Sequence, residues 1–175
     1  MTSILNRLIL ALVAAVTVTA FSNTAAMAFG RVHAPLGYQL MCLKDPGECS
    51  GGGPAQVNAD WDIMAKLRRV NNTVNASMRP VHDGAVDVWT ADAKQGDCEE
   101  FALAKRERLI REGVPASSLR LAYVKTSWGE GHAVLVVETN RGQFVLDVLT
   151  HKILPLSQTR LRVMSMATAD PNVWS

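Results

Sequence analysis

Three side chains in the second half of the sequence are of the types needed for covalent catalysis. Cys98, His132 and Asp147 carry a thiol, an imidazole and a carboxylate. An imidazole can take the proton of a neighbouring thiol, and a carboxylate on its other ring nitrogen fixes the tautomer and stabilises the imidazolium. The thiolate can then attack a carbonyl carbon and form an acyl-enzyme. The three residues are therefore candidates for a catalytic Cys–His–Asp triad.

Each of these residues also has a plainer interpretation when it is taken singly. A buried cysteine is more often structural than catalytic, and a histidine at the end of a strand is usually a surface residue. Asp147 is more informative, because it interrupts the apolar run of residues 144–149. A buried carboxylate needs a polar partner, and His132 is the nearest candidate for that partner.

The clearest helix start in the sequence places Cys98 in a first turn. Asp97 is a good N-cap residue and Glu100 follows three positions later, which is an Asp variant of the capping box. Gly113 and Pro115 end this helix. At a first turn the helix dipole favours an anion, and the free backbone N–H groups are candidate donors to an oxyanion. The position therefore favours a reactive Cys98.

The other two candidate residues lie on a predicted hairpin. His132 opens one strand, and Asp147 lies in the return strand after a loop at residues 140–142. The two side chains are neighbours if the register of the hairpin allows it. The predicted strands are residues 118–125, 132–139, 143–150 and 160–166. Because helices come first and an antiparallel meander follows, the predicted fold class is α+β.

The first half of the chain is predicted to supply one helix and two irregular segments. Residues 29–55 are rich in Pro and Gly and are predicted to form a loop. Asp60 is the expected N-cap of a helix that continues to about Met78. Its later turns carry three asparagines that are expected to face solvent: Asn71, Asn72 and Asn75. Residues 79–95 are predicted to be irregular.

Residues 1–28 have the pattern of a signal peptide. Arg7 precedes an apolar run at residues 8–21, and Ala26-Met27-Ala28 matches a signal-peptidase site. The run is shorter than the ~20 residues that a membrane span needs. Cleavage after Ala28 leaves residues 29–175 as a single domain, periplasmic or secreted, with no stable membrane insertion. The alternative is an uncleaved N-terminal anchor.

Cys42, Cys49 and Cys98 are the cysteines of the predicted mature chain. An exported protein meets an oxidising compartment, where an odd count leaves one thiol unpaired. Cys42 and Cys49 flank a short segment with Pro46 and Gly47, so they are the predicted disulfide. The alternatives are that both stay reduced or that one of them pairs with Cys98.

The charge balance argues against several partners. The chain has 18 Lys and Arg against 16 Asp and Glu, and Arg7 lies in the predicted leader, so the mature chain is close to neutral. No basic stripe is available to replace the counterions of a nucleic acid, and no polybasic patch is available for a membrane surface. The glycine-rich phosphate loops GxxxxGK[ST] and GxGxxG are also absent. A nucleic acid is therefore not the expected partner.

The sequence resembles the bacterial transglutaminase-like cysteine proteinases, which include the LapG-type periplasmic proteases. The resemblance rests on residues 96–100 around Cys98, residues 131–135 around His132 and residues 145–147 ending at Asp147. It implies a papain/transglutaminase-like fold, with a helix bearing the Cys packed on an antiparallel sheet. It also implies Cys98 as nucleophile, His132 as base and Asp147 as the group that orients the base. Trp89 falls on a position where the family often has an aromatic residue. The plainer interpretation is that Trp89 packs in the core or in a lid.

The resemblance also implies calcium, bound by acidic residues beside the nucleophile: Asp97, Glu99 and Glu100. Carboxylates on both sides of Cys98 disfavour a thiolate, and a hard cation with oxygen ligands would offset that repulsion. The plainer interpretation is that acidic residues suit the first turn of a helix. The sequence departs from the family at Glu100, where Asp is usual, and at Val148, where Asn is usual.

The expected function is that of an exported cysteine peptidase that clips a protein. The family implies a cell-surface adhesin as the substrate and an inner-membrane regulator as a further partner. A transglutaminase-like acyl transferase would use the same site with an amine as acceptor. A non-catalytic binding or regulatory module of the same fold is the third interpretation, and the intact set of Cys98, His132 and Asp147 argues against it.

Overall fold

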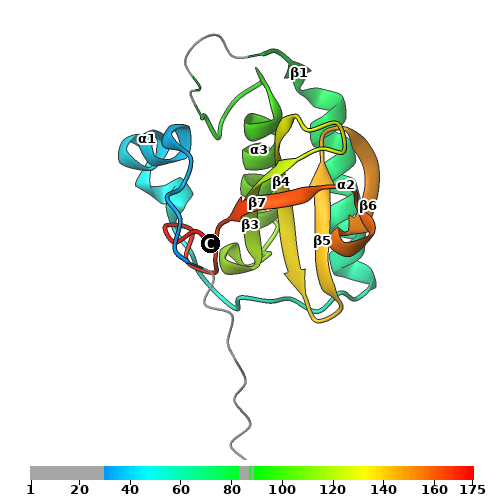
Figure 1. The fold of residues 1–175 in the computed structure, drawn as a ribbon. Helices are drawn as coiled ribbons and strands as arrows, with labels where there is room; N and C mark the ends of the chain where they lie inside the picture. Colours follow the sequence, from blue (N-terminus) through cyan, green and yellow to red (C-terminus); the bar gives the residue numbers. More distant parts are fainter. Residues whose placement is uncertain (1–29, 83–86, 88) are drawn as a thin grey trace, which may run out of the picture.

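The protein is an α+β domain, as the order of its elements predicts. A computed structural model describes residues 30–82, 87 and 89–175 (Figure 1). The predicted signal peptide, residues 1–28, lies outside the described residues. A five-stranded antiparallel sheet has the strand order β6-β5-β4-β3-β7. Its strands are β3 (Leu119–Lys125), β4 (Gly131–Thr139), β5 (Gly142–Asp147), β6 (Thr150–Pro155) and β7 (Arg162–Met166).

Strand β4 is the centre of the sheet and is buried on both faces. Leu135 and Val137 belong to the main core between the sheet and the helices, whereas Val134 and Val136 belong to a smaller cluster on the other face. Alternate residues of a strand point to opposite faces. The continuous apolar run in this strand therefore reflects burial from both sides.

The predicted return strand of the hairpin is interrupted by a turn in the structure. It was expected to run through residues 143–150, but β5 ends at Asp147, and β6, which the sequence analysis missed, begins at Thr150. Asp147 Oδ1 accepts a hydrogen bond from the backbone N–H of Leu149 at 2.9 Å. Such an Asx turn reverses the chain, and Asp147 then pairs with Thr150 in the β5–β6 ladder. The candidate triad acid therefore also forms the turn.

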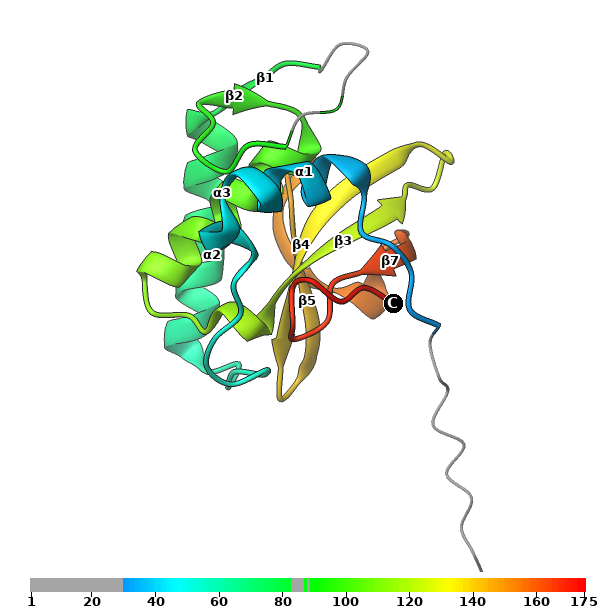
Figure 2. The same cartoon turned by 90° about the vertical axis from the view of Figure 1, so that its left-hand side faces the viewer.

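Two helices cover one face of the sheet (Figure 2). Helix α2 (Trp61–Ser77) begins at the predicted N-cap, where Asp60 Oδ1 accepts from the Ile63 N–H at 2.9 Å. Helix α3 (Cys98–Arg111) begins at Cys98 and has the predicted capping box of Asp97 and Glu100. Gly113, with φ +84°, follows its end. Both helix predictions are confirmed.

The segment predicted as a loop at residues 29–55 contains two helices, so that prediction is wrong. They are α1 (Leu36–Lys44) and a 3₁₀ helix, η1 (Pro46–Cys49). Pro35 and Pro46 stand at their N-terminal ends, where proline is tolerated because no hydrogen bond is lost. Gly37 sits inside α1 because a Cβ there would lie 2.4 Å from the Trp89 ring. Trp89 is buried, as expected for a core aromatic.

The N-terminal segment is fastened to the domain by a disulfide and by a buried arginine. Cys42 and Cys49 form the predicted disulfide, and Cys98 is free. Arg106 of α3 donates from Nη1 to the carbonyl of Glu48 at 2.8 Å and from Nη2 to that of Ser50 at 3.0 Å. These bonds join η1 to the helix that carries Cys98.

Residues 79–95 were predicted to be irregular, and the described part of the segment largely is. Two short strands, β1 (Arg79–Pro80) and β2 (Gln95–Gly96), form a parallel pair at its ends. This pair leads directly into Asp97 and the start of α3. Within the described ranges, no helix has both the length and the apolar composition required to cross a bilayer.

Candidate active site

His132 and Asp147 are in direct contact, as the sequence analysis expected. The Nε2 atom of His132 lies 2.7 Å from Oδ1 of Asp147, and both side chains are buried. The β4–β5 ladder pairs Leu135 with Leu146. Continuing this register by one residue sets Asp147 opposite Val134, so His132 and Asp147 are diagonal neighbours on adjacent strands. The register of the hairpin thus allows the predicted pair.

The surroundings of Asp147 favour its ionised form. Burial alone would raise the pKa of this carboxyl group, but hydrogen bonds from His132 and from the Leu149 N–H outweigh it. The charges of His132 and Lys105 act in the same direction. The pKa of Asp147 is therefore held below its usual value, and an ionised carboxylate faces the imidazole.

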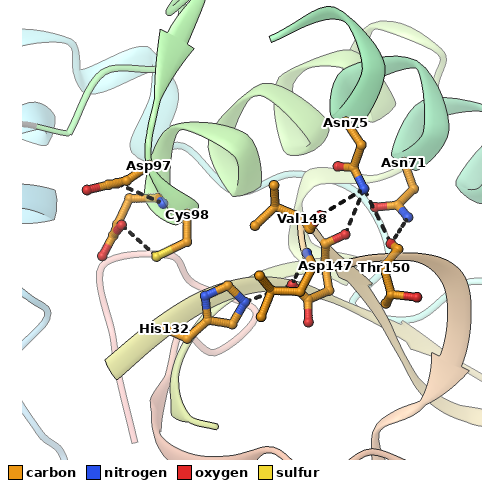
Figure 3. A network of polar contacts seen from close by, with 10 residues as sticks. Asn71, Asn75, Asp97, Cys98, His132, Asp147, Val148 and Thr150 are labelled. Carbon is orange, nitrogen blue, oxygen red and sulfur yellow. Dashed lines mark hydrogen bonds and ion pairs between the residues drawn. The ribbon is translucent and has the colours of Figure 1, made fainter. Parts of the chain in front are cut away.

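Cys98 lies on the other side of the same imidazole (Figure 3). The backbone N–H of Ala133, the residue after His132, acts on this sulfur and lowers the pKa of the thiol. Asp147 is hydrogen-bonded to Nε2 of His132. The other ring nitrogen, Nδ1, faces Cys98 in Figure 3. Cys98 and His132 also line one cleft. The three side chains of the candidate triad are therefore brought together in the order in which the chemistry needs them.

The electrostatics around the sulfur oppose its ionisation. Burial, the Glu99 carboxylate and a hydrogen bond to Glu99 raise the pKa of the Cys98 thiol, and the Ala133 N–H lowers it by less. The thiol donates to Oε2 of Glu99 at 2.9 Å. The helix N-terminus was expected to favour a thiolate. The negatively charged carboxylates of Asp97 and Glu99 oppose that effect.

Two of the three predicted calcium ligands lie beside the sulfur. Asp97, Cys98 and Glu99 each place a potential ligand atom within 4.8 Å of the others. Burial and the neighbouring Asp97 raise the pKa of Glu99 to about 8. Asp97 and Glu99 repel each other when both carboxylates are ionised. A divalent cation bound between them would offset this repulsion, so the pair suits such an ion.

Glu100, the third predicted ligand, is placed differently. It is buried, and both of its carboxylate oxygens accept backbone N–H groups, Oε1 from Thr90 at 3.1 Å and Oε2 from Asp97 at 3.2 Å. It is not part of the group that Asp97 forms with Cys98 and Glu99. The geometry gives Glu100 the role of the capping-box residue that fixes the start of α3.

A network behind Asp147 was missed in the sequence analysis. Asn71 and Asn75 were expected to face solvent, but Asn71 is buried and Asn75 is half-buried; Asn72 is exposed. Asn75 Nδ2 donates to the carbonyls of Asp147 at 2.9 Å and Thr150 at 3.3 Å, and Asn71 Nδ2 donates to Thr150 at 3.0 Å. Figure 3 shows both side chains reaching from α2 to the turn after β5. Their spacing of four residues, beside the buried Val70 and Val74, was the available signal.

Lys105 is a second feature that sequence reasoning did not assign. It is 1% exposed and lies seven residues after Cys98, on the same face of α3. Its Nζ lies 6.0 Å from the centre of the Phe101 ring, and its charge acts on Asp147. Burial lowers the pKa of Lys105 to about 7, although Asp147 opposes this shift.

The cleft above the sulfur has room for a polypeptide segment. Its volume is about 610 Å³. The walls come from four parts of the chain: residues 80–82 at the end of β1, residues 96–101 at the start of α3, residues 126–132 leading into β4, and residues 148–149 after β5. Trp128 and Leu149, two large apolar side chains, line the cleft and are largely exposed. The arrangement can accommodate an extended substrate across Cys98.

Comparison of the sequence with known protein families identifies the class of protein to which this fold and site belong. The family of bacterial transglutaminase-like cysteine proteinases (BTLCP) matches residues 28–175. The chain belongs to this family, and it is a cysteine peptidase with a transglutaminase-like fold.

Solved structures of LapG from Legionella pneumophila are similar to the chain. The calcium-bound structure is 28% identical, with a TM-score of 0.57 over 64% of this chain and 68% of LapG. A second LapG structure and an EGTA-treated one are each 27% identical, with TM-scores of 0.52 and 0.51. They cover 61% and 59% of this chain and 64% and 62% of LapG, so the match spans about two thirds of that protein. No curated protein matches the sequence.

Proposed function

We propose that this cysteine peptidase cleaves its substrate through a triad of Cys98, His132 and Asp147. The contact between His132 and Asp147, with Cys98 on the opposite side of the ring, is the observation that carries the proposal. Family membership supports a thiol nucleophile, and Cys98 is the cysteine outside the disulfide. Each residue then has a role that follows from its position.

The reaction begins with proton transfer from the Cys98 thiol to Nδ1 of His132. Asp147 stabilises the imidazolium from the other ring nitrogen. The thiolate adds to the carbonyl carbon of the substrate, and the tetrahedral intermediate collapses as His132 returns the proton to the leaving amine. A water molecule, deprotonated by His132, then hydrolyses the thioester and releases Cys98. Protons balance, because the imidazole gains one and returns one in each half-reaction.

The backbone at the start of α3 supplies the expected site for the developing oxyanion. N–H groups in the first turn of a helix lack partners within the helix. Where they point at a developing negative charge, they stabilise it together with the helix dipole. In α3 the Asp97 side chain already accepts the Glu99 and Glu100 N–H groups. Cys98 is the first residue of the helix, so its own backbone N–H is the candidate donor to the oxyanion.

We propose that calcium binds beside the nucleophile through Asp97 and Glu99. Their carboxylates share a small volume with Cys98, and the solved relative LapG has a calcium-bound form. When bound, the cation neutralises the negative charge that disfavours a thiolate. Glu99 Oε2 accepts a hydrogen bond from the thiol. Binding of the Glu99 carboxylate to the cation would leave the thiol free to donate to His132.

The location and the natural substrate are proposals of the same kind. The leader pattern at residues 1–28 and the disulfide between Cys42 and Cys49 support export to the periplasm or beyond. A protein of the cell surface, such as an adhesin, is the proposed substrate, and an inner-membrane regulator is a proposed partner. The resemblance to LapG-type proteases supports both.

An amine could replace water as the acceptor of the acyl group, which would make the protein a transglutaminase-like transferase. The triad chemistry is common to the two reactions up to the thioester. The family assignment favours water, because the family is one of proteinases.

The proposal is tested by comparing exported and surface proteins from cells with the wild-type protein and with Cys98→Ser. New protein termini are expected only with the wild type. Crosslinked products without new termini would support the transferase instead. Identical termini in both samples, from cells that express the two proteins equally, would contradict cleavage through Cys98.

A further inference from the structure

A second cavity opens beside the catalytic cleft, and no role has yet been assigned to it. Its volume is about 340 Å³, and it lies between the end of β5, strand β6 and the segment before β7. Thr126, Trp128 and Leu149 line both this cavity and the catalytic cleft. The two spaces therefore share a wall, and a chain lying across Cys98 can reach both.

The walls of this side cavity are mainly apolar. Val145, Leu154 and Leu161 are among its lining residues. At the junction with the cleft, Trp128 is 68% exposed and Leu149 is 60% exposed. Large apolar side chains left in water around a concave space are typical of a binding site for an apolar group.

The charged side chains that line the side cavity are mostly basic. Lys152 and Arg160 are exposed and lie in its wall. Asp147 is the acidic residue among the lining side chains, and its Oδ1 already binds His132 and the Leu149 N–H. A ligand that carries a negative charge next to its apolar group would therefore be favoured here.

We propose that the side cavity is a substrate subsite that takes a bulky apolar side chain of the polypeptide being cleaved, with an acidic residue beside it. The inference rests on the proposed peptidase function, since the occupant is another part of the chain that Cys98 attacks. The shared wall of Thr126, Trp128 and Leu149 favours this occupant over a separate ligand. The volume lies at the lower end of the range of about 300–1,000 Å³ for ligand pockets, which suits one or two side chains.

The subsite is tested by the cleavage profile of the full chain on a peptide library prepared from exported proteins. Wild-type cleavage sites are expected to share a bulky apolar residue at one fixed position from the scissile bond. For a matched pair of peptides with Leu or Ala at that position, the expected ratio of kcat/KM is on the order of tenfold or more. Leu161→Asp is expected to abolish this ratio, because it sets a charge in the apolar wall.

Val163→Asp is the matched control. It introduces the same charge two residues further on, at an exposed position in β7 outside the cavity lining, so the ratio should persist. The ratio compares two peptides on one protein sample and does not depend on the folded fraction. A double variant, Lys152→Glu with Arg160→Glu, covers the case in which Leu161→Asp fails to fold. It should remove the preference for a neighbouring acidic residue.

The outcomes separate the subsite from the peptidase function. Cleavage that depends on Cys98 but shows no apolar preference, or a preference that survives both cavity variants, would overturn the subsite alone. Absence of any cleavage that depends on Cys98 would overturn the proposed function and the subsite with it. A change of oligomeric state in the cavity variants with an unaltered profile would assign the cavity to a second copy of the chain.

Discussion

Asp147 combines three structural roles in one residue. Its carboxylate contacts His132 and accepts the Leu149 N–H, and its carbonyl accepts from Asn75. The sequence predicted the first role, because a carboxylate in an apolar strand needs a partner. The second is a common role of aspartate, but the apolar run around Asp147 concealed the turn. The third depends on which helix packs behind the turn, which the residue type does not encode.

Lys105 should make the stability of the protein depend on pH. Its pKa is lowered to about 7 in the folded state by burial, whereas an unfolded lysine titrates near 10.4. Between these values the unfolded state binds more protons, so the free energy of unfolding rises with pH, by at most ~1.4 kcal/mol per pH unit. Lys105→Met should lack this rise. The variant should therefore be more stable than the wild type, and the difference in unfolding free energy should be largest near pH 7.

Urea unfolding from pH 7 to pH 9.5 checks this prediction. The difference in unfolding free energy between Lys105→Met and wild type should shrink as the pH rises. Lys94→Met is the control, because Lys94 is exposed. A difference that stays constant over this range would show that Lys105 is not the titrating group.

The elements of the fold differ in how much their sequences reveal. Helix α3 has a cap, a helical pattern and a stop signal, so both of its ends were predicted. Helix α1 was missed because Gly37 reads as a helix breaker, and only the Trp89 ring packed against it explains the glycine. The split between β5 and β6 was missed because the Asx turn of Asp147 lies inside an apolar run. Tertiary contacts set both features, so a local pattern cannot show them.

Asn75 is expected to hold the turn between β5 and β6 against helix α2. Its side chain donates to the carbonyls of Asp147 and Thr150. In Asn75→Ala these half-buried carbonyls lose a donor, and the expected loss in the free energy of unfolding is about 1–3 kcal/mol. Denaturant unfolding measures the loss.

Asn72→Ala provides the matched control on the same helix. Asn72 is exposed, so its replacement should change stability by less than about 0.5 kcal/mol. Equal effects of the two substitutions would contradict a specific role for Asn75 and would leave helix propensity as the cause.

At the scale of the whole molecule, the site lies where segments far apart in sequence meet. Helix α3 contributes Cys98, β4 contributes His132 and β5 contributes Asp147. The disulfide and Arg106 join the N-terminal segment to α3. Residue types and compartment predicted the disulfide and the contact between His132 and Asp147. They could not predict the packing of α2 behind the turn or the side cavity, because these depend on the arrangement of the elements.

Calcium is expected to stabilise the folded protein as well as its site. A cation that binds Asp97 and Glu99 in the folded state only raises the melting temperature by mass action. The melting temperature should therefore rise with added calcium and fall with EGTA. In Asp97→Asn combined with Glu99→Gln the dependence should disappear, whereas Glu107→Gln, on the same helix, should retain it. A melting curve of the wild type that neither calcium nor EGTA changes would exclude the proposed site.

The central claim, that His132 and Asp147 activate Cys98, is tested most directly by the rate at which iodoacetamide alkylates this free thiol in the presence of calcium. The wild type should react faster than a free thiol near neutral pH. His132→Ala and Asp147→Asn should react at least about tenfold more slowly, and His151→Ala, an exposed histidine of β6, should react like the wild type. Equal rates in all four proteins would contradict the triad.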